Sequence, residues 1–182
     1  ISGPPQLYEL GNWPSPFGIV MVLDRLSAMM VTLTSLLALL VLLYAIQAWD
    51  TRGRHFHALF QFQLMGLAGA FLTGDLFNLF VFCEILLIAS YALLLHGGGR
   101  ARSRAGLHYV IINLAGSALF LIALGTLYGL TGTLNMADLA LRVAEAPPED
   151  EPLLAAASLI LLVVFGIKAA ILPLLFWLPR AY

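Results

Sequence analysis

Two ionisable side chains, those of Glu84 and Lys168, occur well inside long apolar stretches of the 182-residue chain. A charge in the hydrocarbon core of a membrane is costly, so such a residue is expected to have a partner or a function. Glu84 lies about nine residues into its stretch, or roughly 13 Å at ~1.5 Å per residue, near the middle of a bilayer. Lys168, the only lysine in the sequence, lies at a similar depth in another stretch. These two residues are therefore the first candidates for chemistry.

The pair has two interpretations. In one, Glu84 and Lys168 form a static ion pair that orients two helices. In the other, they take up and release protons, which glutamate and lysine can do and arginine, the better static strut, cannot. If the charges approach to about 6 Å at an effective dielectric of ~20, their attraction is roughly 3 kcal/mol, so a proton arriving on Glu84 would loosen the proton on Lys168. The use of lysine favours proton transfer.

Other polar residues give weaker signals. Asp75 is best interpreted as a helix cap, although its place above Glu84 allows an accessory role at the mouth of a proton path. His108 opens an apolar stretch, where a titratable ring could relay protons, and is the second accessory candidate. Asn113 and Ser117 are interpreted as interhelical hydrogen-bonding residues.

The sequence carries no motif for a cofactor, a metal or a nucleophilic enzyme. The single cysteine, Cys83, excludes multi-cysteine metal sites, and there is no phosphate loop or zinc motif. The formal net charge of -1 gives no nucleic-acid footprint. We expect no cofactor, no metal, no nucleic-acid partner and no classical catalytic residue. The pattern indicates a transporter rather than a classical enzyme.

The composition places these residues in membrane helices. Hydrophobic residues make up 61% of the chain and charged residues 10%, with a mean hydropathy of +0.94. Stretches of about 20 apolar residues are long enough to cross a bilayer. The sequence predicts an all-α integral membrane protein with five such spans, at about 26–48, 58–73, 76–95, 107–130 and 153–177. Pro173 should kink the last span. Small residues within the spans should allow close helix approach, namely Gly66, Gly69, Gly116 and Ala118.

The charges between the spans predict the topology. Arginines follow the first, third and fifth spans, whereas acidic residues follow the second and fourth; Arg142 is the one exception. Because arginine and lysine accumulate in cytoplasmic loops, this alternation places the N-terminus outside. Residues 131–152 form an outer loop, in which Asn135 should cap a short helix lying on the surface. Both ends of the sequence look cut, as expected of a fragment.

Four segments resemble a known family. Residues 73–94, TGDLFNLFVFCEILLIASYALL, resemble the glutamate-bearing span of the D subunit in Mrp-type multisubunit monovalent cation/proton antiporters. The segments that agree with it are NWPSPFGI (12–19) with DRLSA (24–28), YGLTGTLNMAD (128–138) and FGIKAAILPLLFWLPRAY (165–182). The fold is shared with the antiporter-like proton-pumping membrane subunits of respiratory complex I and of membrane-bound hydrogenases.

The resemblance implies more than the residues alone. It makes the five spans the third to seventh of a subunit of about fourteen helices, and it makes Glu84 and Lys168 a proton-transfer pair. It implies a bacterial cytoplasmic (inner) membrane, other antiporter subunits as partners besides the lipid bilayer, and protons with Na⁺ or K⁺ as the transported ions. The first alternative is a proton-pumping membrane subunit of an NADH:quinone oxidoreductase or hydrogenase. The second is a membrane scaffold that transports nothing.

Overall fold

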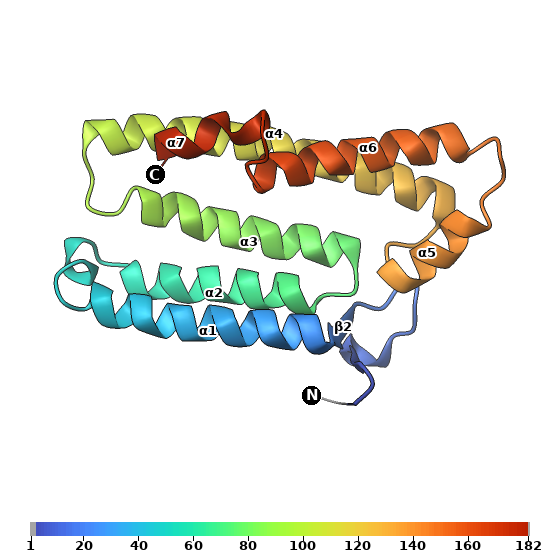
Figure 1. The fold of residues 1–182 in the computed structure, drawn as a ribbon, viewed down its shortest axis with the longest axis horizontal. Helices are drawn as coiled ribbons and strands as arrows, with labels where there is room; N and C mark the ends of the chain where they lie inside the picture. Colours follow the sequence, from blue (N-terminus) through green and yellow to red (C-terminus); the bar gives the residue numbers. More distant parts are fainter. Residues whose placement is uncertain (1–2, 182) are drawn as a thin grey trace.

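The computed structural model describes residues 3–181, and these are mostly helical (Figure 1). The long helices are α1 (Arg25–Ala45), α2 (Phe56–Leu72), α3 (Leu76–Leu94), α4 (Arg100–Thr131) and α6 (Glu151–Lys168). The short ones are α5 (Met136–Ala144), α7 (Leu178–Ala181) and the 3-10 turns η1 (Leu10–Asn12), η2 (Asp50–Arg52) and η3 (Leu174–Trp177). Two short strands, β1 (Gln6–Glu9) and β2 (Val20–Leu23), form an antiparallel hairpin before α1.

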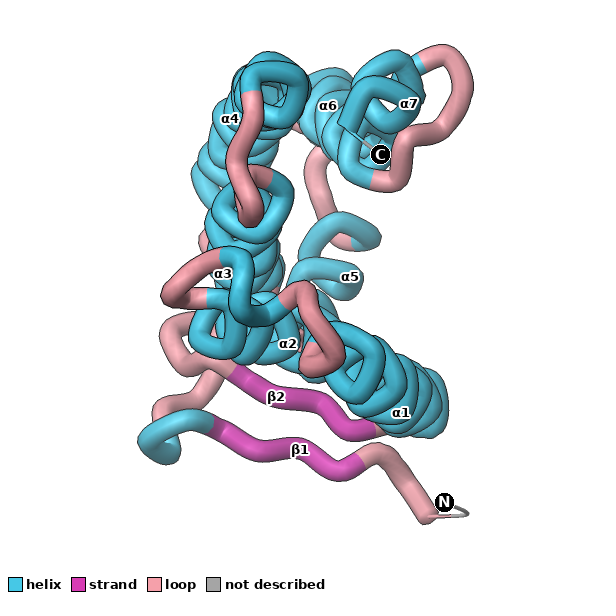
Figure 2. Tube along the Cα trace, turned by 90° about the vertical axis from the view of Figure 1, so that its left-hand side faces the viewer, coloured by secondary structure: helices cyan, strands magenta, loops and turns pink. Residues whose placement is uncertain are grey.

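The long helices run side by side and follow an open arc. Helix α2 packs against α1 and α3, α3 against α4, and α4 against α6. The end-on view in Figure 2 shows α1 to α4 along the arc, with α6 and α7 beside α4. We call the end with α5 and residues 149–151 the acidic end, and the end with the loops 46–55 and 95–99 the arginine end (Figure 1).

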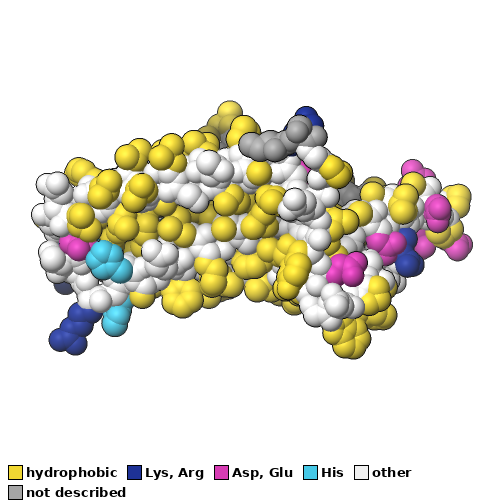
Figure 3. All heavy atoms as spheres, turned by 90° about the horizontal axis from the view of Figure 1, so that it is seen from below, with side chains coloured by type: hydrophobic (Ala, Val, Ile, Leu, Met, Phe, Trp, Pro, Cys, Tyr) yellow, Lys and Arg dark blue, Asp and Glu magenta, His cyan; other side chains and the backbone are white. Residues whose placement is uncertain are grey.

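The helices have the length and surface of membrane spans. Helices α1, α3, α4 and α6 are long and apolar enough to cross a membrane, and α2 is a shorter apolar helix of 17 residues. Helix α1 buries only Ser27, Ala38 and Ala45, so most of its apolar side chains face outward. Figure 3 shows apolar side chains over much of one face, with charged groups gathered toward its ends. Lipid is the solvent that suits such a surface.

Three helices start at the polar caps expected of their sequence. The Asp24 side chain accepts a hydrogen bond from the Ser27 N–H at 2.7 Å and starts α1. Asp75 accepts from the Asn78 N–H at 2.8 Å and starts α3, and Asn135 caps the short helix α5. The predicted caps at Asp75 and Asn135 are confirmed.

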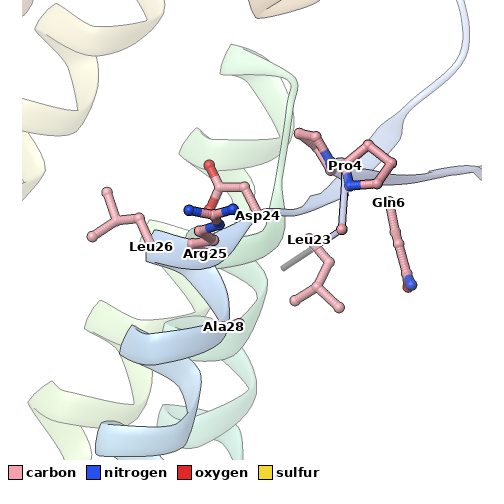
Figure 4. Close-up of a pocket in the computed structure, with 9 residues that line it drawn as sticks. Pro4, Gln6, Leu23, Asp24, Arg25, Leu26 and Ala28 are labelled. Atoms are coloured by element: carbon pink, nitrogen blue, oxygen red, sulfur yellow. The ribbon is translucent and has the colours of Figure 1, made fainter. Parts of the chain in front are cut away.

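The N-terminal hairpin was not predicted, and it holds the acidic end together. The Gly74 N–H donates to the Val20 carbonyl at 2.8 Å, and the Met136 N–H donates to the Gly74 carbonyl at 2.8 Å. The turn between α2 and α3 is therefore held between β2 and the segment that leads into α5. The hairpin and the start of α1 also enclose a hollow of about 630 Å³ lined by residues 3–6, 23–26 and 28 (Figure 4). It shares no residue with the Glu84 and Lys168 site.

The predicted last span, 153–177 with a kink at Pro173, is wrong in its second half. Helix α6 ends at Lys168, and Pro173 lies in the non-helical link before η3. Ala170 has a φ of +51°, and the Ile171 N–H bonds back to the Gly166 carbonyl at 2.9 Å, which closes the helix. Proline lacks an N–H and disfavours helical backbone before it, so the helix does not resume until after Pro173.

Helices α2 and α3 approach closely because Gly66 and Gly69 lie between them. A Cβ at position 66 would lie 2.7 Å from the Leu86 backbone nitrogen and 2.8 Å from the Phe82 carbonyl oxygen. Backbone atoms cannot rotate away as a side chain can. The predicted role in close packing is thus explained at Gly66 by a contact between backbones, whereas a Cβ at position 69 would lie 2.2 Å from the Cδ1 of the Phe82 ring.

Gly66→Ala should therefore destabilise the protein by about 1–3 kcal/mol, the usual cost of overpacking. Gly125→Ala is the matched control, because nothing lies within 4 Å of a Cβ at position 125. The measurement is the thermal unfolding midpoint of each purified variant in detergent. Equal midpoints for Gly66→Ala and the parent protein would contradict the close packing of α2 on α3.

Candidate proton-transfer site

The structure brings the two intramembrane charges together. Glu84 lies in the middle of α3, and Lys168 is the last residue of α6. The Lys168 Nζ lies 3.8 Å from the Glu84 Oε1, and the side chains are 13% and 25% exposed, respectively. Helix α4 lies between their two helices and supplies the contact that joins them.

Ser117 of α4 bridges the pair. Its Oγ donates a hydrogen bond to the Glu84 Oε1 and accepts one from the Lys168 Nζ at 3.4 Å. Ser117 is 4% exposed, so its hydroxyl is buried between the helices. The sequence indicated a hydrogen-bonding residue here but not its partners. Its spacing of four from Asn113, which places both polar residues on one face of α4, was the available signal.

The end of α6 places Lys168 where a cation is favoured. The carboxyl end of a helix carries a partial negative charge, which stabilises a nearby ammonium. The Trp177 Nε1 donates to the Ile167 carbonyl at 2.9 Å, and the Ala169 N–H donates to the Phe165 carbonyl at 2.8 Å. Side chain and backbone donors thus satisfy carbonyls that the broken helix leaves free.

An aromatic layer covers the acidic-end side of the pair. Phe80 lies one turn from Glu84, Phe120 one turn from Ser117, and Phe165 one turn from Lys168, all toward the acidic end. Ring centroids of Phe80 and Phe120 are 5.7 Å apart, and those of Phe120 and Phe165 are 5.5 Å apart. Phe120 is 0% exposed. Phe165 is 39% exposed, so the apolar layer is buried at Phe120 and open to the surface at Phe165.

The arginine-end side of the pair is lined by polar aromatic groups instead. Tyr109 of α4 contacts Tyr91 and Trp177, with ring centroids 5.2 and 5.0 Å away. Its hydroxyl lies 3.2 Å from the Ser90 Oγ, and the buried Asn113 donates to the Tyr109 carbonyl at 3.0 Å. The polarity around the pair is thus asymmetric along the bundle.

The accessory candidates Asp75 and His108 do not contact the pair in the described part of the chain. Asp75 lies about 13 Å from Glu84 along the axis of α3, at ~1.5 Å per residue. His108 packs its ring 6.4 Å from that of Phe176, and its Nε2 is buried without a hydrogen-bond partner among residues 3–181. Their roles in proton movement stay predictions. Pro173 helps to end α6 rather than kinking it.

The arginine-bearing loops meet at one end of the bundle. The guanidinium carbons of Arg52 and Arg102 lie 4.6 and 4.9 Å from the ring centroid of Trp49. The His96 Nε2 lies 2.9 Å from the Trp49 carbonyl oxygen, and Arg102 donates to the His96 carbonyl. Loops that the charge alternation placed on the same side of the membrane are therefore in direct contact. Within residues 3–181 no group of His, Cys, Asp and Glu could hold a metal ion.

Together these features define a multi-pass membrane protein with a charge pair buried between its helices. The chain belongs to the NADH:quinone oxidoreductase/Mrp antiporter transmembrane family, whose model matches residues 73–182. It is 60% identical over 97% of its length to a probable K⁺/H⁺ antiporter D subunit from Rhizobium meliloti, covering 33% of that protein. It is 48% identical over 96% of its length to the Na⁺/H⁺ antiporter D subunit from Alkalihalophilus pseudofirmus, covering 35% of it.

A solved structure gives the same result. The chain superimposes on a chain of the Mrp complex from Dietzia sp. DQ12-45-1b with a TM-score of 0.88 and 36% identity, over 99% of this chain and 34% of that one. The predicted fold class and family resemblance are confirmed. The chain spans about a third of the length of the curated relatives that it matches.

The burial of Asp75 at the acidic end can be tested through the pH dependence of protein stability. Burial raises the pKa of Asp75, although the N–H groups of Asn78 and Phe77 act in the opposite direction. When the folded pKa exceeds the unfolded one, stability is greatest at low pH and falls as pH rises through the folded pKa. Asp75→Asn keeps a good cap and removes the charge.

We therefore expect Asp75→Asn to unfold at a higher temperature than the parent at neutral pH, and the difference to shrink on acidification. Asp75→Ala, which lacks the cap, should be less stable than Asp75→Asn by about 1 kcal/mol. Unfolding midpoints of the detergent-solubilised protein, recorded from acidic to neutral pH, provide the measurement. A parent protein that gains stability over Asp75→Asn as pH rises would contradict the burial of this carboxyl group.

Proposed function

We propose that the protein is a proton-translocating membrane subunit of a multisubunit monovalent cation/proton antiporter, with Glu84 and Lys168 as its proton-transfer pair. The observation that carries the proposal is the 3.8 Å approach of a titratable acid and a titratable base in the interior of membrane helices. The relatives support it, since two of them are named as D subunits of antiporters for K⁺ or Na⁺ and protons. The intact protein works with other subunits of its complex.

The distance between the two charges sets the strength of their coupling. At about 4 Å and an effective dielectric of about 20, a pair of unit charges attracts by roughly 4 kcal/mol. The structure thus gives a closer approach than the 6 Å considered from the sequence. A proton that neutralises Glu84 removes this attraction and makes Lys168 a stronger proton donor. Each transfer in this way prepares the next.

The family also contains subunits of NADH:quinone oxidoreductases, so a redox-linked proton pump is the alternative function. Both functions use the same pair. They differ in the partner complex, which the flanking genes of the intact reading frame would identify. The named antiporter relatives favour the antiporter over a redox-linked pump and over a scaffold that transports nothing.

We further propose that the protein lies in a bacterial cytoplasmic membrane with five crossings in this region and residues 3–24 outside. Helix α2, at 17 residues, is at the short end of the range that spans a bilayer. Its neighbours α1 and α3 run antiparallel to it along its length, which supports its crossing with them (Figure 1). The acidic end then faces outward and the arginine end faces the cytoplasm.

Replacing either charge should stop ion exchange in the intact complex. Glu84→Gln and Lys168→Ala should each abolish antiport, because neither new side chain can cycle a proton. Lys168→Arg should also fail although it keeps the charge, because arginine does not release its proton. Glu84→Asp should retain part of the activity with an altered pH profile. Cation-dependent proton flux in membrane vesicles gives the rates, and subunit abundance gives the amount of assembled complex.

The static ion pair predicts a different order. If the pair is static, Lys168→Arg should keep its antiport activity. Lys168→Ala should lose activity because the complex does not assemble, and not because the assembled complex cannot turn over. Asp138→Asn is the control for removing a carboxylate, since Asp138 lies on α5 and pairs with Arg142. An active and normally assembled Lys168→Arg complex would overturn the proton-transfer role.

The topology is tested by side-specific labelling. After Cys83 is replaced, single cysteines introduced at Ser103, at the arginine end, and Glu149, at the acidic end, should react with an impermeant thiol reagent from opposite sides of sealed vesicles. Both positions are exposed in the structure. Labelling of both from the same side would show that α4 does not cross the membrane as proposed.

A further inference from the structure

We propose that Ser117 is the proton relay between Lys168 and Glu84, an inference that rests on the proposed proton-transfer function. The hydroxyl is the one group that hydrogen-bonds to both charged side chains in the described structure. The direct distance between the charges, 3.8 Å, exceeds the range of a hydrogen bond. In this structure the hydrogen-bonded route for a proton therefore runs through the Ser117 Oγ.

The orientation of this hydroxyl is unusual for the chain. Serine and threonine within helices often donate to the carbonyl four residues earlier in their own helix. Thr32, Ser35, Thr126 and Ser158 all do so here. Ser117 instead donates across to α3, to the Glu84 carboxylate. The Ser117 hydroxyl thus bonds to the Glu84 carboxylate instead of a carbonyl of its own helix, and in this orientation its oxygen can accept from the Lys168 ammonium.

The transfer through this chain of bonds balances without another reactant. A proton leaves the Lys168 Nζ and bonds to the Ser117 Oγ, while the proton already on that oxygen moves to the Glu84 Oε1. The N–H bond and the original O–H bond break, and two new O–H bonds form. A charged pair becomes a neutral amine and a neutral carboxylic acid, and Ser117 is again a hydroxyl, now with its proton supplied by the lysine. The reverse transfer restores the ions.

The surroundings favour this short route over a water chain. Ser117 is 4% exposed, and Phe120, one turn toward the acidic end, is 0% exposed. The Glu84 side chain is 25% exposed, so water can reach the carboxylate more easily than it reaches the Ser117 hydroxyl between the two charges. Burial disfavours charged groups, so a transfer that turns the ion pair into a neutral pair is a step that the bundle can accommodate.

The test compares Ser117→Ala with Ser158→Ala in the intact complex. Ser158 lies on α6, and its hydroxyl donates to the Leu154 carbonyl of its own helix at 2.8 Å. We expect Ser117→Ala to lower the antiport rate about tenfold. Loss of a general acid or base typically costs about 10²- to 10⁴-fold, but here a water molecule can fill part of the gap. Ser158→Ala should exchange ions at the parent rate.

The solvent isotope effect separates a relay from a structural role. When transfer between Lys168 and Glu84 becomes the slow step, the ratio of rates in H₂O and D₂O should rise in Ser117→Ala. A structural defect lowers the amount of assembled complex. It leaves the ratio of the rates in H₂O and D₂O unchanged when the rates are divided by that amount. A parent rate in Ser117→Ala, or a lower rate with an unchanged isotope effect, would overturn the relay.

A second pair of variants covers the case in which the alanine variant fails to assemble. Ser117→Thr and Ser117→Val add nearly the same volume, and only threonine keeps the hydroxyl. The relay predicts faster exchange with threonine at equal assembly; equal rates, or assembly of neither, would assign Ser117 to packing. Glu84→Gln serves as the reference. If it is inactive while Ser117→Ala is normal, the relay fails and the proposed function stands; if Glu84→Gln is active, the proposed function itself fails.

Discussion

The cost of holding a carboxylate and an ammonium among apolar helices is the constraint on which the rest of the structure depends. Either charge alone would be expensive to bury, so α3 and α6 must bring Glu84 and Lys168 to the same point. Helix α4 fills the space between them and contributes Ser117. The end of α6 at Lys168 adds the negative end of a helix dipole beside the ammonium. Packing, helix length and hydrogen bonding therefore all converge on one pair.

The side chains on the two sides of the Glu84 and Lys168 pair differ in polarity. Toward the acidic end, Phe80, Phe120 and Phe165 form an apolar layer. Toward the arginine end, Tyr109 and Ser90 supply hydroxyl groups. In the proposed function, the polar side chains therefore lie on the cytoplasmic side of the pair and the apolar rings on its outer side. A full cycle also needs access from the opposite face, and the chain spans only about a third of the length of its relatives.

Much of this arrangement could be predicted from the sequence, because membrane helices have a strong composition signal and buried charges are rare in them. The long helices, the caps at Asp75 and Asn135, and the glycines between α2 and α3 follow from local patterns. The end of α6 did not, since it depends partly on the Trp177 side chain reaching the Ile167 carbonyl. The hairpin β1–β2 is short and pairs with loops that are distant in the sequence. The contacts of Ser117 could not be predicted, because most serine and threonine hydroxyl groups in helices bond to the backbone of their own helix. Hydropathy indicates how deep a residue lies in the membrane but not which residue it contacts.

Proton exchange on Glu84 can be measured by infrared difference spectroscopy of the intact complex after a change of pH, because a protonated carboxylic acid gives a distinct C=O stretch. If Glu84 exchanges protons, we expect a band that appears when Glu84 takes up a proton, is absent in Glu84→Gln and persists in Asp138→Asn. A spectrum in which Glu84→Gln leaves every carboxyl band unchanged would show that Glu84 does not exchange protons, and would contradict the account.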